Sequence, residues 1–234
     1  MLINYSKNKR RKRQLFFWRA RIHGAIVGGM YDGICQRQRT NLGMERENPY
    51  FNAGILLIDE ERARKANLSE RYSSFLNKVN GILRFQDQDL MNASLKTKEK
   101  CVLPFKYDAG GGVFFLSYKQ YKQLRKPALY YSETEFNETK NNPVIVHFYS
   151  FFLETTRVWN TGSKHPFKAE FFDYKNRSPY KDVSLPKDSR PFFKKIILKI
   201  VHYFPHFLTI PLVSFFYNYV IPKKYAKALK KTHK

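Results

Sequence analysis

The feature that most constrains the fold is a short apolar run, residues 55–58, which follows Gly54 and stops at the carboxylate of Asp59. Such a run is typical of a buried strand in an α/β protein, and the glycine lets the backbone approach a ligand or a neighbouring segment closely. Residues 60–80 then have helical composition, with apolar side chains recurring roughly on one face. A strand followed by a helix is what a parallel sheet needs, so we predict an α/β fold.

Two carboxylates flank an amide in the run Asp87-Gln88-Asp89, beside an apolar stretch. One interpretation is structural, because a carboxylate at the start of a helix is stabilised by the free N–H groups there. The functional interpretation places Asp87 against a substrate hydroxyl and Gln88 beside the reacting carbon, where a neutral amide can orient groups or stabilise charge. The residues alone leave both interpretations open.

A β-branched run, residues 144–146, ends at His147. In an open α/β sheet the carboxyl end of a strand points toward the crevice in which ligands bind. Imidazole is a common ligand of divalent transition metals, although a histidine at a strand end is more often structural. His147 is therefore a candidate site residue for which both roles stay open.

Taken in order, residues 48–59, 85–92 and 143–148 resemble the sugar-transfer half of a family 8 glycosyltransferase of the bacterial lipopolysaccharide or lipooligosaccharide galactosyl- or glucosyltransferase type. The resemblance covers about residues 22–182. It implies a GT-A-type, Rossmann-like α/β fold. It also implies transfer of a hexose from a UDP-sugar to a saccharide acceptor, with retention of configuration at the anomeric carbon.

The resemblance assigns roles to individual residues. Asn52, Ala53 and Gly54 would line the floor between donor and acceptor sugars. Asp87 would bind hydroxyls of the donor sugar, and Gln88 would lie on the face from which the anomeric carbon is attacked.

The phosphate end of the site is also implied by the resemblance. His147 would bind Mn²⁺, which neutralises charge on the nucleotide diphosphate leaving group. Arg157 takes the place of the family's phosphate-binding lysine if Trp159 is the family's tryptophan, and a guanidinium can bind phosphate through two N–H groups.

One departure from the family concerns the amino end. Family members begin with βαβ units that form the nucleotide pocket and end in an Asp-x-Asp that binds the metal. Here residues 1–21 are basic, and the first acidic residue is Asp32. We therefore expect an amino-terminally incomplete domain and weak Mn²⁺ binding, since divalent ions need several ligands, unless another chain supplies the missing half.

Charge is concentrated at the two ends of the chain. The net charge is +24, all 19 acidic residues lie between Asp32 and Asp188, and eight basic residues precede and ten follow that range. The basic run 7–13 is compatible with nucleic acid or an anionic membrane.

The carboxyl end favours the membrane. Its lysines alternate with large apolar residues, and one face of a helix over 190–204 collects Phe193, Ile196, Ile197, Ile200, Val201 and Phe204. Residues 200–222 carry no charged side chain, but Pro205 and Pro211 interrupt them, so we expect a segment that lies on the membrane and does not cross it. The alternative is that these aromatic residues pack onto the catalytic domain.

We therefore predict three segments: a basic segment 1–21, a glycosyltransferase domain 22–185 and a basic aromatic membrane-associating segment 186–234. The partners expected are a nucleotide sugar, a saccharide or lipid-linked glycan acceptor and an anionic membrane surface, with no nucleic acid. Only two cysteines, Cys35 and Cys101, and no secretory segment suggest a cytoplasmic protein on the inner face of the membrane. The alternative function is a catalytically inactive fragment that binds the membrane surface or has no function.

Overall fold

The computed structural model describes residues 2–4, 22, 24–149, 151 and 157–231. The predicted basic segment 1–21 therefore lies outside the described residues, apart from residues 2–4. The strands in the described part of the protein are β1 (Leu2–Asn4), β2 (Val27–Tyr31), β3 (Phe51–Ile58), β4 (Lys100–Val102), β5 (Ala109–Gly110) and β6 (Ile145–His147). The helices up to residue 125 are α2 (Gln36–Asn41), α3 (Glu60–Lys65), α4 (Leu68–Lys78), α5 (Gln86–Ser94), η1 (Thr97–Glu99), η2 (Phe105–Tyr107), α6 (Gly112–Phe115) and α7 (Tyr118–Arg125). The later helices are α8 (Glu133–Asn141), α9 (Lys168–Asn176), α10 (Phe192–Tyr203), α11 (His206–Phe215), η3 (Phe216–Val220) and α12 (Ile221–Lys231).

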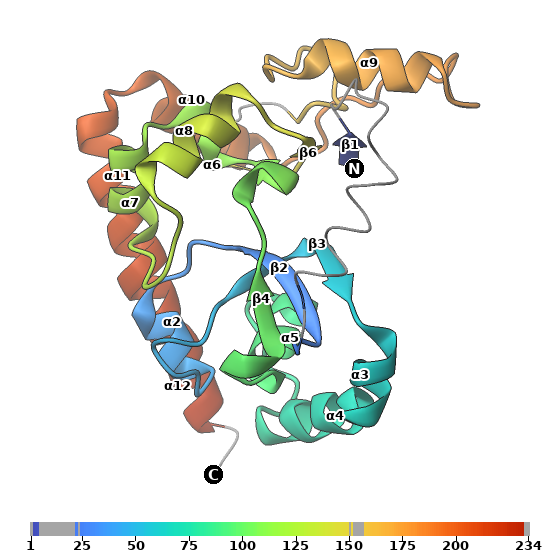
Figure 1. Ribbon diagram of the computed structural model, residues 1–234. Helices are drawn as coiled ribbons and strands as arrows, with labels where there is room; N and C mark the ends of the chain where they lie inside the picture. The colour runs from blue at the N-terminus through green and yellow to red at the C-terminus, as the bar shows by residue number, and fades with distance from the viewer. Residues whose placement is uncertain (1, 5–21, 23, 150, 152–156, 232–234) are drawn as a thin grey trace.

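The described strands form two small sheets, β3-β2-β4 and β1-β6-β5, with helices around them (Figure 1). The mixed α/β architecture agrees with the prediction, and so do the strand over residues 51–58 and the strand that ends at His147. The predicted parallel pairing of the first strand is wrong, because β3 runs antiparallel to β2, with Val27 opposite Ile58. The parallel partner of β2 is β4, which the chain reaches after α3, α4 and α5.

Strand β3 is also less buried than predicted. It lies at the edge of its sheet, and among its residues Phe51 is fully buried while the others are half-buried or exposed. The helix predicted over 60–80 is divided into α3 and α4, because Asn67 adopts a left-handed conformation with φ of 50°.

A bulge in β3 shapes the site. Gly29 pairs with Leu56 and Tyr31 with Phe51, so one residue of β2 lies opposite four residues of β3. The extra residues, 52–55, cannot continue the ladder and bend away from it. The bulge thus takes Asn52, Ala53 and Gly54 out of regular pairing.

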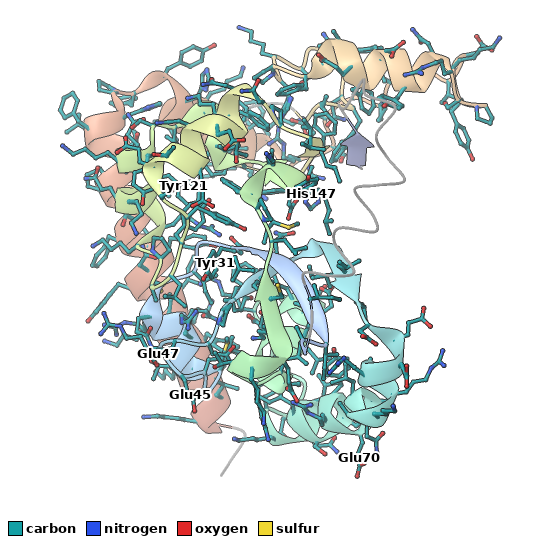
Figure 2. All side chains as sticks on the ribbon, in the orientation of Figure 1. Tyr31, Glu45, Glu47, Glu70, Tyr121 and His147 are labelled. Carbon is teal, nitrogen blue, oxygen red and sulfur yellow. The ribbon has the colours of Figure 1, made fainter. Side chains whose placement is uncertain are left out.

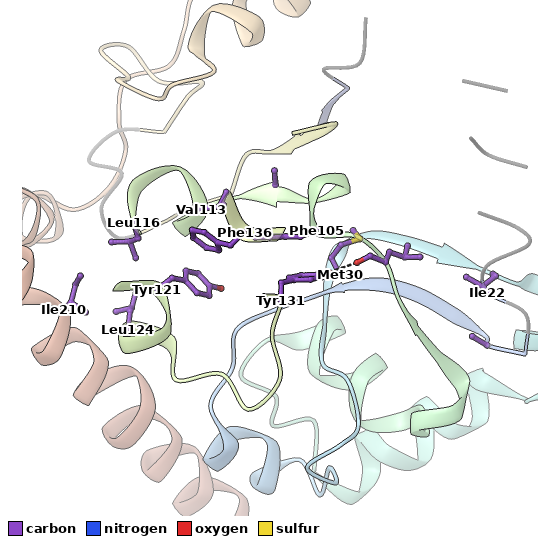
Figure 3. Packing of buried hydrophobic residues seen from close by; sticks show 13 residues of the cluster. Ile22, Met30, Phe105, Val113, Leu116, Tyr121, Leu124, Tyr131, Phe136 and Ile210 are labelled. Carbon is purple, nitrogen blue, oxygen red and sulfur yellow. Dashed lines mark hydrogen bonds between the residues drawn. The ribbon is translucent and has the colours of Figure 1, made fainter. Parts of the chain in front are cut away.

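The two faces of the β3-β2-β4 sheet pack differently. On one face Val27 and Phe51 cluster with Met91 of α5 and with Leu95, which follows that helix. The other face meets an aromatic core (Figure 3), in which Phe105 and Tyr131 stack with ring centroids 4.8 Å apart. This core fixes α7 and β2 relative to each other.

The carboxyl-terminal helices run along one side of the molecule, drawn in red in Figure 1. Helix α10 is present as predicted over residues 192–203 and has no buried residue, whereas α11 buries Thr209, Ile210 and Ser214. Helix α12 is tied down by Tyr225, whose hydroxyl donates to the Ile82 carbonyl at 2.8 Å. Helices α11 and α12 thus pack onto the rest of the chain, as the alternative interpretation expected, although α11 also exposes Phe207, Leu208 and Leu212. The apolar side chains of α10 are mostly exposed.

Within the described part of the chain, no helix is both long enough and apolar enough to cross a membrane.

Candidate active site

A cavity of about 580 Å³ collects most of the predicted site residues. Asn52, Ala53 and Gly54 come from the bulge in β3, Asp87 and Gln88 from the first turn of α5, and His147 from the end of β6. Figure 2 labels His147 and also Tyr121 of α7, which lines the same cavity. Six of the seven predicted residues therefore lie around one space, although they are separated by up to 95 positions in the chain.

Gln88 is the most firmly held of them. Its Oε1 accepts from the Ala53 N–H at 3.1 Å, and its Nε2 donates to Asp32 Oδ2 at 2.8 Å and to the Tyr50 hydroxyl at 3.3 Å. The side chain is buried, so each bond is largely shielded from water. The amide is consequently fixed in position at the cavity wall.

The two carboxylates that flank Gln88, Asp87 and Asp89, lie in different environments. Asp89 is buried and accepts from the Tyr50 hydroxyl at 2.6 Å and from the backbone N–H groups of Arg84 and Phe85 at 2.9 and 2.8 Å. Burial raises the pKa of the Asp89 carboxyl, and these hydrogen bonds oppose the shift. Asp89 is thus structural, as the capping interpretation allowed, whereas Asp87 is exposed and its carboxylate has no hydrogen-bond partner among the described residues.

Asn92 attaches α5 to the strand that carries the bulge. Its side-chain oxygen accepts from the Phe51 N–H and its Nδ2 donates to the Phe51 carbonyl, both at 2.8 Å. Both backbone groups of Phe51 are therefore paired with one buried amide, as buried polar groups require. Asn92 thus joins the last turn of α5 to the first residue of β3.

Two further residues, Asp32 and Arg125, lie in the cavity although the sequence analysis did not select them. Asp32 accepts from Gln88 at 2.8 Å and from Arg125 at 2.7 Å, and the two charged side chains are only about 15% exposed. Asp32 follows β2 directly, at a strand end like that of His147, and this position was a signal that could have been used. Arg125 could not have been selected in this way, because in the sequence it is one of several basic residues of a helix and does not stand at a strand end.

His147 is oriented by a buried carboxylate. Its Nδ1 lies 2.8 Å from Asp108 Oδ1, and burial raises the Asp108 pKa against the effect of this bond. The imidazole lies directly on Gly54, where an added Cβ would be 2.0 Å from His147 Cε1. Glycine is thus required at position 54 for close approach, as predicted, although the segment that approaches is part of the protein.

The described residues do not form a complete metal site. Within the described ranges, no group of three or more His, Cys, Asp and Glu side chains is arranged to hold a metal ion. A carboxylate that orients a histidine is a common arrangement behind a metal ligand, and His147 with Asp108 has it. A single histidine nevertheless supplies too few donors for Mn²⁺.

Arg157 is the predicted site residue that does not line the cavity. Its guanidinium lies 5.3 Å from the ring centroid of Trp159, the residue used to align it. Part of the cavity lining comes from the carboxyl-terminal helices, through Val213 and Tyr217. The sequence analysis expected this segment to lie on the membrane, with packing onto the catalytic domain as the alternative, and did not place Val213 or Tyr217 in the site.

The geometry and the sequence identify the protein class. The model of the family "Glycosyl transferase family 8" matches residues 17–160, more than half of the chain, so the chain belongs to the family 8 glycosyltransferases. The match begins five residues before the predicted domain boundary at residue 22.

Individual relatives agree with this family. The chain is 28% identical over 171 residues to General stress protein A of Bacillus subtilis, covering 72% of this chain and 56% of the relative. It is 27% identical over 177 residues to the lipopolysaccharide glucosyltransferase WaaO of Escherichia coli, covering 74% of this chain and 42% of the relative. The chain thus spans about half the length of these curated relatives.

The fold is shared with a solved glycosyltransferase. The galactosyltransferase LgtC, solved with donor and acceptor sugar analogues, superposes with a TM-score of 0.55 at 15% identity, covering 80% of this chain and 60% of that chain. The predicted GT-A-type fold is therefore confirmed.

Proposed function

We propose that the chain transfers a hexose from a UDP-sugar to a saccharide acceptor, with retention at the anomeric carbon. The observation that carries this proposal is the Gln88 amide, held on both of its polar atoms at the wall of a cavity next to the unpaired carboxylate of Asp87. A fixed neutral amide beside a free carboxylate suits a polyhydroxylated ligand, because the carboxylate accepts hydroxyl bonds and the amide needs no reorganisation.

The residues divide the reaction between them. Asp87 binds hydroxyls of the donor sugar, Asn52, Ala53 and Gly54 form the floor, and Gln88 lies beside the anomeric carbon. The bond from the anomeric carbon to the phosphate oxygen breaks and the nucleoside diphosphate leaves with the bonding electrons. The acceptor hydroxyl oxygen forms the new bond on the same face, and its proton passes to the departing phosphate oxygen.

Mn²⁺ at His147 and phosphate binding by Arg157 stay predictions. The orientation of His147 by Asp108 supports a ligand role, and the guanidinium of Arg157 lies on Trp159, away from the cavity lining. No step above depends on either group.

We also propose that the protein is cytoplasmic and binds the inner face of the membrane, where lipid-linked acceptors for lipopolysaccharide or other surface glycans are held. The support is α10, in which Phe192 and Phe193 are 77% and 75% exposed beside the lysines of an end without acidic residues. Flotation with anionic and with neutral vesicles tests this. Equal binding to both would remove the electrostatic part of the proposal.

A second candidate is a catalytically inactive member of the family that binds the membrane surface. The observation in its favour is the lack of a three-ligand metal group among the described residues.

Calorimetric titration with UDP, with and without Mn²⁺, separates the two candidates. The active protein is expected to bind UDP in a Mn²⁺-dependent manner that His147→Ala abolishes, and to lose sugar transfer by about 100-fold in Gln88→Ala. A folded chain that binds no UDP and transfers no sugar would instead be the inactive candidate.

A further inference from the structure

Tyr217, in η3 of the carboxyl-terminal helices, contacts two arginines from distant parts of the chain. The guanidinium carbons of Arg84 and Arg125 each lie 4.4 Å from the centroid of its ring. A guanidinium at this distance over an aromatic ring is attracted by the π electrons, and the more so where water is excluded. The ring also lines the cavity, so these contacts are made at the site itself.

One of the arginines leads directly to the catalytic amide. Arg125 donates to Asp32 Oδ1 at 2.7 Å, and Asp32 Oδ2 accepts from Gln88 Nε2 at 2.8 Å. Each oxygen of the Asp32 carboxylate therefore has one of these two partners. The rotation of the Gln88 amide depends on where Arg125 holds that carboxylate.

The other arginine leads to the helix that carries Gln88. Arg84 and Phe85 donate their backbone N–H groups to Asp89 Oδ2 and so form the entry to α5. A contact that restrains the Arg84 side chain therefore also restrains the backbone segment, Arg84 and Phe85, that leads into α5. Tyr217 is thus connected to Gln88 through two separate sets of contacts, one through Arg125 and Asp32 and the other through Arg84 and the start of α5.

The helix that presents Tyr217 is firmly docked on the domain. The Ser214 hydroxyl donates to the Gln123 carbonyl at 2.8 Å, and Asn218 Nδ2 donates to the Leu124 carbonyl at 2.7 Å. Both bonds join it to the last turn of α7, which also carries Arg125. The ring therefore has a defined place relative to its partners.

We propose that Tyr217 is a positioning residue for Gln88 and that the carboxyl-terminal helices are a structural part of the sugar-transfer site. The proposal rests on the proposed function in treating Gln88 as the catalytic amide. Tyr217 acts through Arg125 and Arg84 and does not itself take part in the reaction. The segment that presents apolar residues toward a membrane on α10 thus also holds the site together from α11 onward.

Hydrogen–deuterium exchange of the whole chain tests the proposal without requiring turnover. The informative amides are those of Ala53, which donates to Gln88, and of Arg84 and Phe85, which donate to Asp89. In Tyr217→Leu we expect these three amides to exchange about tenfold faster, since the ring is lost. Tyr217→Phe keeps the ring and is expected to match the wild type.

Tyr219→Leu is the matched control, because Tyr219 lies on the same η3 turn but contacts Arg37 outside the cavity. It is expected to leave the three amides unchanged. Equal exchange in Tyr217→Leu and Tyr219→Leu would overturn the proposal. If Tyr217→Leu fails to fold, Arg125→Lys is the second variant: it keeps the charge near Asp32 but lacks the planar group, and is expected to affect Ala53 alone.

Steady-state kinetics provide the second readout. In Tyr217→Leu we expect kcat to fall about tenfold while the KM for the donor stays within about twofold, because a displaced Gln88 slows the reaction more than it weakens binding. A wild-type chain that transfers no sugar would contradict the proposed function, whereas the exchange experiment would still decide the role of Tyr217.

Discussion

At the Gln88 end of the cavity both polar atoms of the amide have protein partners, whereas at the other end the His147 imidazole is held by Asp108 and by its contact with Gly54. The first arrangement is a network of backbone and side-chain bonds that spans β2, β3 and α5. The second depends on the hydrogen bond to Asp108, the close approach to Gly54 and an edge contact with the Tyr149 ring, whose centroid lies 5.0 Å away. The comparison indicates that the Gln88 end is fixed by several bonds within the protein, whereas the His147 end is held by fewer contacts among the described residues.

The largest effect should come from breaking the network at Asn92. In Asn92→Ala three hydrogen bonds are lost and the backbone groups of Phe51 stay buried without partners, so the free energy of unfolding should fall by about 3 kcal/mol. Urea denaturation measures this. The exposed Asn77→Ala on α4 is the control and should change stability by less than about 0.5 kcal/mol. Equal values for the two variants would show that the network adds nothing.

The next largest effect tests the close approach at the His147 end. A methyl group at position 54 would overlap the imidazole, so Gly54→Ala should displace His147 and lower the rate of sugar transfer by about 100-fold. The double variant Gly54→Ala with His147→Ala removes the overlap. Its thermal stability should therefore equal that of His147→Ala alone, and a double variant less stable than this would place the cause elsewhere.

The smallest effect concerns the packing beneath His147. His165 is buried, its ring lies 4.8 Å from that of Phe148, and its Nδ1 accepts from the Phe167 N–H at 3.1 Å. Burial lowers its pKa to about 4, so the folded state keeps it neutral after the unfolded chain has taken up a proton. Stability contributed by neutral His165 is complete above about pH 6.5 and should fall as pH decreases toward 4, by less than the loss expected in Asn92→Ala.

Denaturation at several pH values checks this prediction. In His165→Gln, which can still accept a hydrogen bond but does not titrate, the difference from the wild type between pH 6.5 and pH 4 should disappear. An unchanged pH dependence would mean that other groups control it.

The part of the site that could be predicted from sequence is the part encoded locally. Asp87 and Gln88 lie in the first turn of α5 and His147 ends β6, and short apolar runs beside them locate those elements. Arg125 and Tyr217 could not be found in this way. Their roles depend on contacts across 93 and 92 positions, and on their own they read as a helix cation and an interfacial aromatic.

The fold shows the same limit. The strand 51–58 was predictable from its apolar run, but its antiparallel pairing depends on the direction in which the chain returns from α2. Strand β1 pairs with β6, next to His147, although residues 2–4 begin the predicted basic segment. A three-residue strand gives too short a pattern to recognise without its partner.

The order of the carboxyl-terminal helices affects how the protein should be handled in the laboratory. Helix α10, with its exposed apolar residues, comes before α11 and η3, which form a wall of the cavity. Shortening the chain from its end far enough to remove the exposed apolar residues of η3 and α11 would therefore also delete Tyr217 and Val213 from the cavity wall, and would leave α10 in place. Polar substitutions at Phe192 and Phe193 would address solubility and keep the wall intact.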